Sequence, residues 1–182
     1  MGPADVKRKL SDIAVSDKNR PMILAAKRLI EQDYGWLYIY GGPGNAKSEV
    51  LKAIVNAFNT AGRGPAMYTS LGAILDYMRL TMSSNNNLEY YNELERLKNI
   101  KILAIDEMDK PQETGWMEDF RFHFMDARYI SAVNRQTVTV FAGQTNPQSF
   151  GDVLYDRIRD GRFEVVHNQA PSARAQMRWQ SE

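Results

Sequence analysis

The stretch that decides the fold is "YIYGGPGNAKSEVLKAIV", residues 38–55. It runs from an apolar strand through a glycine-rich turn into a helix with apolar residues along one stripe. This order is the context of a phosphate-binding loop, whose usual pattern is G-x-x-x-x-G-K-[ST]. Ala46 stands where that pattern has its second glycine. The first question is therefore whether the loop is a working nucleotide site.

The residues of the loop suit phosphate chemistry. Backbone N–H groups at such a turn converge on phosphates, helped by the positive end of the helix that follows. Lys47 would reach the β- and γ-phosphates of ATP, and the hydroxyl of Ser48 would bind Mg²⁺. The predicted nucleotide-binding residues are Gly42, Pro43, Gly44, Asn45, Ala46, Lys47, Ser48 and Glu49.

Ala46 is compatible with a working loop. It supplies the same backbone N–H as glycine, and a methyl group is the smallest side chain that can be added. Because Ala46 lies where the loop passes into the helix, we expect it to need no positive φ. The loop resembles that of the MCM replicative helicases, which also carry alanine before the lysine and are active ATPases. The alternative is a glycine-rich turn with a chance Lys-Ser.

A second motif, "ILAIDEMD" at residues 102–109, favours the nucleotide site. It places Asp106 and Glu107 at the end of an apolar strand, where ligands bind in open α/β sheets. An aspartate there holds Mg²⁺ through its water shell, and a neighbouring glutamate polarises the attacking water. Asp109 is a weaker candidate and is expected to be a turn residue before Pro111.

A third polar group follows the strand in "TVTVFAGQTNPQSF", residues 137–150. The strand ends in Gln144, Thr145 and Asn146. If this strand lies between those of the other two motifs, Asn146 would point toward the γ-phosphate and the attacking water, and its amide can hydrogen-bond both. The alternative is that "TNP" is a turn that ends the strand.

Composition narrows the class of protein. The 182-residue chain is 43% hydrophobic and 25% charged, with a formal net charge of +1, as in an ordinary globular domain without a global signal for nucleic acid. Cysteine is absent, which excludes disulfides and thiolate zinc sites, and two isolated histidines argue against a histidine metal site. With no apolar run long enough for a bilayer and no apolar signal core, we expect a cytoplasmic protein.

Strands alternate with helices along the chain, and the strands are apolar on both faces. This pattern predicts an α/β fold with a parallel sheet covered by helices on both sides. No domain boundary is evident, so residues 1–182 are expected to form one domain, with an N-terminal segment at 1–20 and a tail at 175–182. The predicted strands are 36–41, 66–70, 101–106, 137–143 and 163–167, and the predicted helices are 21–33, 47–60, 71–82, 88–97 and 116–133.

Together the motifs resemble the AAA+ ATPase domain of the bacterial helicase-loader and transposition-helper group (DnaC/DnaI-type loaders and IstB-type helpers). The resemblance spans about Pro21 to Arg174. Each short motif is weakly specific by itself, but the set of motifs in this order is specific. In that group a helix ending in Arg-Tyr precedes a strand ending in Thr-Asn or Ser-Asn, and Asp-Arg and Ser-x-Arg segments follow. The matching stretches are "GGPGNAKS", "ERLKNIKILAIDEMD", "DARYISAVNRQTVTVFAGQTNP", "YDRIRDGR" and "APSAR".

The resemblance implies a P-loop NTPase with strand order 5-1-4-3-2 and a reduced or absent lid domain. We expect no N-terminal extension that grips a helicase and no lid beyond Arg174. By their match to the family segments, Arg157 would contact the nucleotide of a neighbouring subunit and Arg174 that of its own. Self-association would use the Arg157 face. The implied catalytic residues are Glu107, Lys47, Asn146, Arg157 and Arg174, with Ser48 and Asp106 at the metal.

The leading functional interpretation is an ATPase, with ATP and Mg²⁺ as cofactors, that assembles on single-stranded DNA and helps to load a replicative helicase. One alternative is a transposition helper that binds duplex DNA and a transposase. Another is a nucleotide-sensing module with little hydrolysis, against which Glu107 argues. Candidates for a basic or base-stacking surface are Arg63, Lys98, Lys101, Arg121, Arg128, Arg135, Tyr77, Tyr90 and Tyr91, although solvated faces are the simpler interpretation of these residues.

Overall fold

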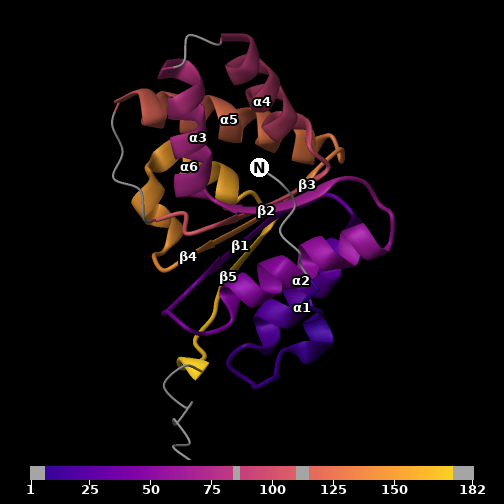
Figure 1. Cartoon of the computed structure of the whole chain (residues 1–182). Helices are drawn as coiled ribbons and strands as arrows, with labels where there is room; N and C mark the ends of the chain where they lie inside the picture. The colour runs from indigo at the N-terminus through magenta and orange to yellow at the C-terminus, as the bar shows by residue number, and fades with distance from the viewer. Residues whose placement is uncertain (1–6, 84–86, 110–114, 174–182) are drawn as a thin grey trace, which may run out of the picture.

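The computed structural model describes residues 7–83, 87–109 and 115–173. Five parallel strands form one sheet in the order β2-β3-β4-β1-β5, which is the order 5-1-4-3-2 expected from the sequence (Figure 1). Continuous apolar runs make such strands, because both faces of a parallel sheet are covered. The strands are β1 (Gly35–Tyr40), β2 (Ala66–Ser70), β3 (Ile102–Asp106), β4 (Val138–Gly143) and β5 (Glu164–His167).

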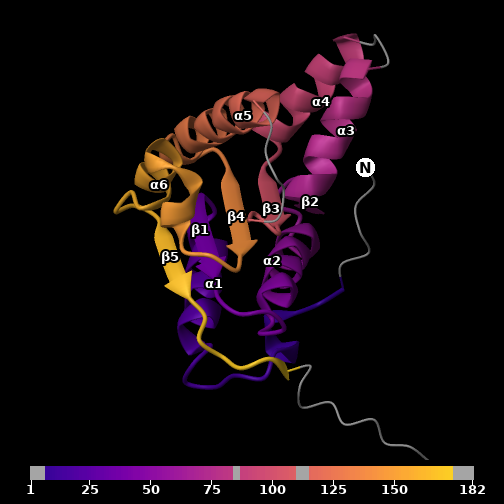
Figure 2. The same ribbon diagram turned by 90° about the vertical axis from the view of Figure 1, so that its left-hand side faces the viewer.

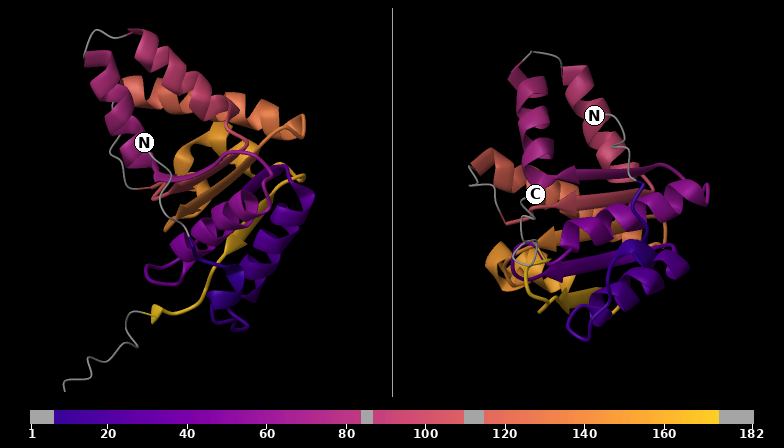
Figure 3. Two further views of the ribbon diagram at one scale, coloured as in Figure 1. Left: turned by 45° about the vertical axis from the view of Figure 1, so that its right-hand side comes forward. Right: turned by 60° about the horizontal axis from the view of Figure 1, so that its bottom comes forward.

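Helices cover both faces of the sheet (Figure 3). One face carries α1 (Arg20–Gln32) and α2 (Lys47–Thr60). The other carries α3 (Leu71–Ser83), α4 (Asn87–Asn99), α5 (Gly115–Val133) and α6 (Asp152–Ile158). In the described part of the chain, no helix combines the length and the apolar character that a membrane span requires.

Alternate residues of β1 feed two separate cores. Trp36 and Tyr38 are buried against α3–α6, whereas Leu37 and Ile39 are buried against α1 and α2. This alternation is the two-residue period of a strand with both faces covered. β1 is thereby packed on both faces, and the loop that follows Tyr40 starts from a buried strand.

Three short elements are absent from the sequence-based assignment. These are the 3₁₀ helices η1 (Leu10–Asp12) and η2 (Pro147–Phe150), and the helix α6. Only Leu154 and Ile158 of α6 are buried, so its seven residues give no sustained helical period. All ten predicted strands and helices begin and end within two residues of their expected bounds.

Arg128 is not part of a basic surface, which corrects the expectation from sequence. Its side chain is 0% exposed and donates to the carbonyls of Ile100 at 2.5 Å and Val138 at 2.7 Å. Burial lowers the pKa of Arg128. Carbonyl groups at a helix end lack partners within the helix, so the carbonyl of Ile100 after α4 is available to accept from Arg128. The guanidinium thus connects the end of α4 to the start of β4.

The strand order brings three predicted motifs to one edge of the sheet. β3, β4 and β1 are consecutive neighbours and run parallel, so their carboxyl ends lie side by side (Figure 2). The condition set for the polar tip of β4, that this strand lies between β1 and β3, is therefore met. Ligands of open α/β sheets bind at this edge.

Candidate nucleotide-binding site

The glycine-rich loop connects β1 directly to α2. Ala46 precedes the first helical residue and has φ 69° and ψ 14°, the left-handed conformation. The expectation that Ala46 needs no positive φ is therefore wrong. The turn bends the chain into α2 through a left-handed residue at this position, which is where glycine is favoured and where alanine carries about 1–2 kcal/mol of strain.

Lys47 is folded back onto its own loop. Its Nζ donates to the carbonyls of Gly41 and Gly42, both at 2.7 Å, and to Oδ1 of Asn45 at 3.0 Å. Burial lowers the pKa of Lys47, whereas the charges of Asp106 and Asp109 raise it. The ammonium group thus has three neutral oxygens as its hydrogen-bond partners, and a phosphate oxygen would be a stronger, charged acceptor in their place.

The segment after β5 lies against the loop. Asn168 N–H donates to Tyr40 O at 2.7 Å, and Ala173 N–H donates to Gly44 O at 2.9 Å. A Cβ built on Gly41 would lie 2.2 Å from Asn168 O, and one on Gly44 would lie 2.2 Å from Ser172 Oγ. Both glycines also have positive φ, so they are required by the close approach of this segment as well as by the turn.

Glu49 lies in the first turn of α2, and its carboxylate forms ion pairs with side chains of the protein itself. It pairs with Arg8 at 2.8 Å and with Lys52 at 3.5 Å. By contrast, a Cβ on Gly42 would meet nothing within 4 Å, so the loop is open on that side. The open side is the part of the loop that a phosphate can approach.

Asp106 and Ser48 meet at a single hydroxyl group. Tyr68, on β2, donates to Asp106 Oδ2 at 2.7 Å, and Ser48 hydrogen-bonds to the same phenol. Burial and the bond to Asp106 raise the pKa of Tyr68. The serine and carboxylate oxygens therefore lie within reach of one common point, and such oxygen ligands are those that Mg²⁺ prefers. The donor set fits the metal predicted for these two residues.

Glu107 is exposed at the end of β3 and has φ 58°. Its backbone N–H is held by Asp106 Oδ1 at 2.9 Å. A left-handed conformation is unusual for glutamate and is found at sites that the surrounding structure over-determines. It turns the chain sharply after Asp106, so that Asp106 and Glu107 enter the same pocket from consecutive positions.

One pocket is lined by residues of both the phosphate loop and the acidic motif after β3. It has a volume of about 120 Å³, smaller than pockets that enclose a whole drug-sized ligand, and thus fits the phosphate part of a nucleotide. The phosphate loop and the loop after β3 come from segments about 60 residues apart in the chain. The lining residues are Pro43, Gly44, Lys47, Ser48, Asp106, Glu107, Asp109, Gly143 and Gln144.

Asn146 does not line this pocket, although the sequence analysis expects it at the phosphates. Its Oδ1 accepts from Gln148 N–H at 3.1 Å and caps η2, and it borders a separate hollow with Tyr40 and Arg159. The reason is the turn that follows Gly143, the last residue of β4. Gln144, the residue after Gly143, lines the phosphate pocket instead.

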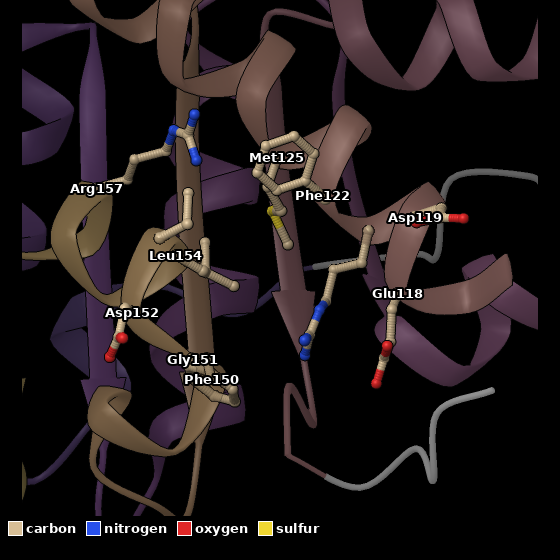
Figure 4. Close-up of a pocket in the computed structure, with 11 residues that line it drawn as sticks. Glu118, Asp119, Phe122, Met125, Phe150, Gly151, Asp152, Leu154 and Arg157 are labelled. Carbon is tan, nitrogen blue, oxygen red and sulfur yellow. The ribbon is translucent and has the colours of Figure 1, made fainter. Parts of the chain in front are cut away.

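Arg157 lies on α6, in a hollow of about 340 Å³ between α5 and α6 (Figure 4). It forms an ion pair with Asp126 and lies 5.2 Å and 5.6 Å from the ring centres of Phe122 and Tyr129. The structure does not bring Arg157 to the phosphate pocket of its own chain. Arg174, the other predicted arginine, lies outside the described residues.

Two residues at the site carry no role in the sequence analysis, and a third, Asp109, is only a weaker candidate there. Asn168 directly follows β5, which is the available signal for it, whereas Tyr68 lies in the middle of β2 and has no such signal. Asp109, treated there as a turn residue, accepts two backbone N–H groups from the tip of β4. Composition alone cannot single out any of the three.

This strand order and the loop between β1 and α2 give the chain the fold expected from the sequence, that of a parallel α/β P-loop domain. The chain matches the replicative helicase loader DnaC of Buchnera aphidicola subsp. Schizaphis graminum with 24% identity over 148 residues, 80% of this chain and 60% of that protein. The predicted resemblance to the helicase-loader group is thus confirmed. No family model matches the chain.

Solved structures agree on the fold. The replication initiator DnaA bound to AMPPCP and single-stranded DNA superposes with a TM-score of 0.78 and 19% identity, over 91% of this chain and 50% of that one. A DnaC helicase loader gives a TM-score of 0.74 and 12% identity, over 89% of this chain and 97% of that one. The chain therefore spans about half the length of the DnaA structure, and the predicted fold class is confirmed.

Proposed function

We propose that the protein binds ATP with Mg²⁺ and hydrolyses it. The observation that carries the proposal is the meeting of Lys47, Ser48, Asp106 and Glu107 in one pocket at the carboxyl edge of the sheet. A lysine for the phosphates, two oxygen ligands for the metal and a carboxylate beside them are the parts that phosphoryl transfer to water requires. The AMPPCP bound to a DnaA of the same fold supports a nucleotide as the ligand.

Each residue has a separate task in this reaction. Lys47 leaves the loop carbonyls and binds the phosphate oxygens. Glu107 orients a water molecule and accepts its proton, since its carboxylate is exposed to the pocket. Ser48 and Asp106 would hold Mg²⁺, which supplies neutralisation of the phosphate charge when bound.

The biological task we propose is loading of a replicative helicase, with single-stranded DNA as a further partner and self-association through the Arg157 face. The similarity to a DnaC loader supports the task, and the DnaA complex with single-stranded DNA supports the nucleic-acid class. In this proposal Arg157 leaves Asp126 and reaches the nucleotide of a neighbouring subunit, while Arg174 contacts that of its own. The second candidate is a transposition helper that binds duplex DNA, because the same motifs also resemble those of the transposition helpers.

The test is ATP turnover by the wild-type protein and by Glu107→Gln. The substitution keeps the shape of the side chain and removes its charge, so we expect MgATP binding to persist and turnover to fall by roughly a hundredfold or more. Equal turnover in the two proteins would refute the role of Glu107, and a wild type that binds but hardly turns over would make the chain a nucleotide sensor.

The same assay separates the two biological tasks. Turnover is measured alone, with single-stranded DNA and with duplex DNA of the same sequence. Stimulation by the single strand supports the loader, and a strong preference for duplex supports the transposition helper. Indifference to both would contradict DNA as a partner.

A further inference from the structure

The α5–α6 hollow, which contains Arg157, has an apolar floor. Met125 and Leu154 are buried there. Beside them Phe122, on α5, and Val153, on α6, are 44% and 51% exposed. Side chains of the two helices face one another across the hollow (Figure 4). Large apolar side chains that remain exposed around a concave site are typical of a surface that a partner covers.

The same hollow is lined by more acidic than basic side chains. Three of them are exposed carboxylates that form no ion pair within the part of the chain that the structure describes, namely Glu118, Asp119 and Asp152. Of the two arginines that line the hollow, Arg121 and Arg157, the second is paired with Asp126. An occupant that brings a large apolar side chain and a positive charge would therefore complement this surface.

The chain itself carries such a segment after Ala173, the last residue that the structure describes. Residues 175–182 read AQMRWQSE and place Arg178 between Met177 and Trp179. Tryptophan, methionine and arginine are residue types enriched at protein interfaces, and tryptophan and arginine often dominate the binding energy there. The tail 175–182 thus has the chemistry that the hollow would bind.

The tail starts beside the phosphate loop. Ala173 donates its backbone N–H to Gly44 O at 2.9 Å. Trp179 follows Ala173 by six residues, and an extended chain of that length spans about 20 Å. In the proposed self-association, Arg157 of one subunit reaches the nucleotide of its neighbour. The neighbour's phosphate loop, and with it the start of the neighbour's tail, would then lie next to the hollow that contains Arg157.

The tail of the same chain fits the hollow less well. A second hollow, of about 430 Å³, shares Glu118 and Phe150 with the first and extends to Asp109. Asp109 also lines the phosphate pocket, together with Gly44. A tail that followed this path from Gly44 would cover the phosphate pocket of its own chain, which the proposed function requires to be open.

We propose that residues 175–182 of one subunit dock in the α5–α6 hollow of a second copy of this chain. Trp179 contacts the apolar floor, and Arg178 pairs with the carboxylates that line the hollow. This inference rests on the proposed function, because it uses self-association through the Arg157 face. It adds a contact that does not involve the nucleotide, and this contact keeps Arg157 of one subunit close to the phosphate loop of the next.

Cysteine cross-linking tests the contact, and the sequence contains no cysteine that would compete. Gln180→Cys is placed in one protein and Val153→Cys in a second protein of different mass, and the two are mixed with MgATP under mild oxidation. We expect a covalent dimer of the two proteins, because a disulfide requires Cβ atoms about 4 Å apart. In the control, Lys27→Cys, at an exposed position of α1, replaces Val153→Cys and should give roughly a tenth of the product or less. Equal yields would overturn the proposal.

A chain that carries both Gln180→Cys and Val153→Cys identifies which copy supplies the tail. Docking between copies predicts covalent dimers and larger oligomers of this variant. A covalently closed monomer without oligomers would place the tail in the hollow of its own chain and would overturn the proposal.

Self-association measured by sedimentation gives a second readout. We expect Trp179→Ala to raise the dissociation constant between subunits by about tenfold or more, the scale of a dominant interface residue. Gln180→Ala, in the same tail, is the matched control and should stay close to wild type. Self-association of Trp179→Ala as strong as that of wild type would contradict the docking of this side chain.

The outcomes also separate this inference from the proposed function. If wild type binds MgATP and self-associates, but the cross-link is absent and Trp179→Ala behaves as wild type, the inference is refuted and the proposed function stands. If wild type stays monomeric with MgATP, the proposed self-association is refuted and the inference falls with it.

Discussion

The side chains of Asn45 and Asn168 each donate to the backbone of the other residue. Nδ2 of Asn168 donates to Asn45 O at 2.7 Å, and Nδ2 of Asn45 donates to Asn168 O at 3.1 Å. Both residues are buried, with 3% and 1% of their surfaces exposed. Since Oδ1 of Asn45 also accepts from Lys47 Nζ, this reciprocal pair connects the end of β5 to the lysine of the phosphate loop.

Replacement of Asn168 should therefore weaken both the fold and the site. Asn168→Ala leaves the buried Asn45 carbonyl without its partner, which costs about 1–3 kcal/mol in the free energy of unfolding. Denaturant titration measures that change, and nucleotide titration should show weaker ATP binding. The control is Asn134→Ala at an exposed position, expected to stay within about 0.5 kcal/mol of wild type. Equal stabilities of the two variants would contradict the structural role of the pair.

Glycine at position 46 should stabilise the protein. The φ of 69° at Ala46 suits glycine, so we expect Ala46→Gly to raise the free energy of unfolding by up to about 1 kcal/mol, after the entropy of the added glycine is subtracted. ATP binding should persist, because the backbone N–H is unchanged. The same substitution at Ala57, inside α2, should lower stability by about 1 kcal/mol. Losses of similar size at both positions would mean that Ala46 is not left-handed in solution.

The Tyr68 hydroxyl should influence metal binding. Tyr68→Phe removes only the group that holds Asp106 beside Ser48, so we expect half-saturating Mg²⁺ in AMPPCP binding to rise by roughly tenfold. The exposed Tyr91→Phe is the control. An unchanged Mg²⁺ dependence in Tyr68→Phe would remove this tyrosine from the site.

The role of Arg157 can be separated from that of its ion pair. If Arg157 acts on a neighbouring subunit, Arg157→Ala should lower turnover by a factor of roughly a thousand, whereas Asp126→Ala should have a much smaller effect. A mixture of Lys47→Ala and Arg157→Ala proteins should then regain activity where an intact loop faces an intact arginine. Similar losses in Arg157→Ala and Asp126→Ala, with no regain on mixing, would assign Arg157 to structure alone.

Most of the fold could be predicted because its elements carry strong periodic signals. The strands β1, β3 and β4 are unbroken apolar runs, and α2 carries Val50, Leu51 and Ile54 on one stripe. The helix α6 could not be predicted, since seven residues with two buried positions give too short a pattern. Motif spacing likewise identified the loop and the acidic pair.

Side-chain direction at the site could not be predicted from spacing. Three polar residues follow β4, and which of them faces the pocket depends on the turn after Gly143. Arginine is usually exposed, but Arg128 is buried, because carbonyl groups after α4 and in β4 accept hydrogen bonds from it. The left-handed angle of Ala46 follows from the geometry of the whole loop and has no signature in the residue type.

The central claim, that this loop is a working nucleotide site despite its alanine, is tested most directly by equilibrium binding of MgATP to wild type and Lys47→Ala. The control is Lys27→Ala at an exposed position of α1, which also removes one positive charge. We predict that wild type and Lys27→Ala bind MgATP with similar affinity. Lys47→Ala should still fold but lose binding almost completely, because it lacks the ammonium group that would bind the phosphates. Equal affinity of Lys47→Ala and wild type would contradict the claim.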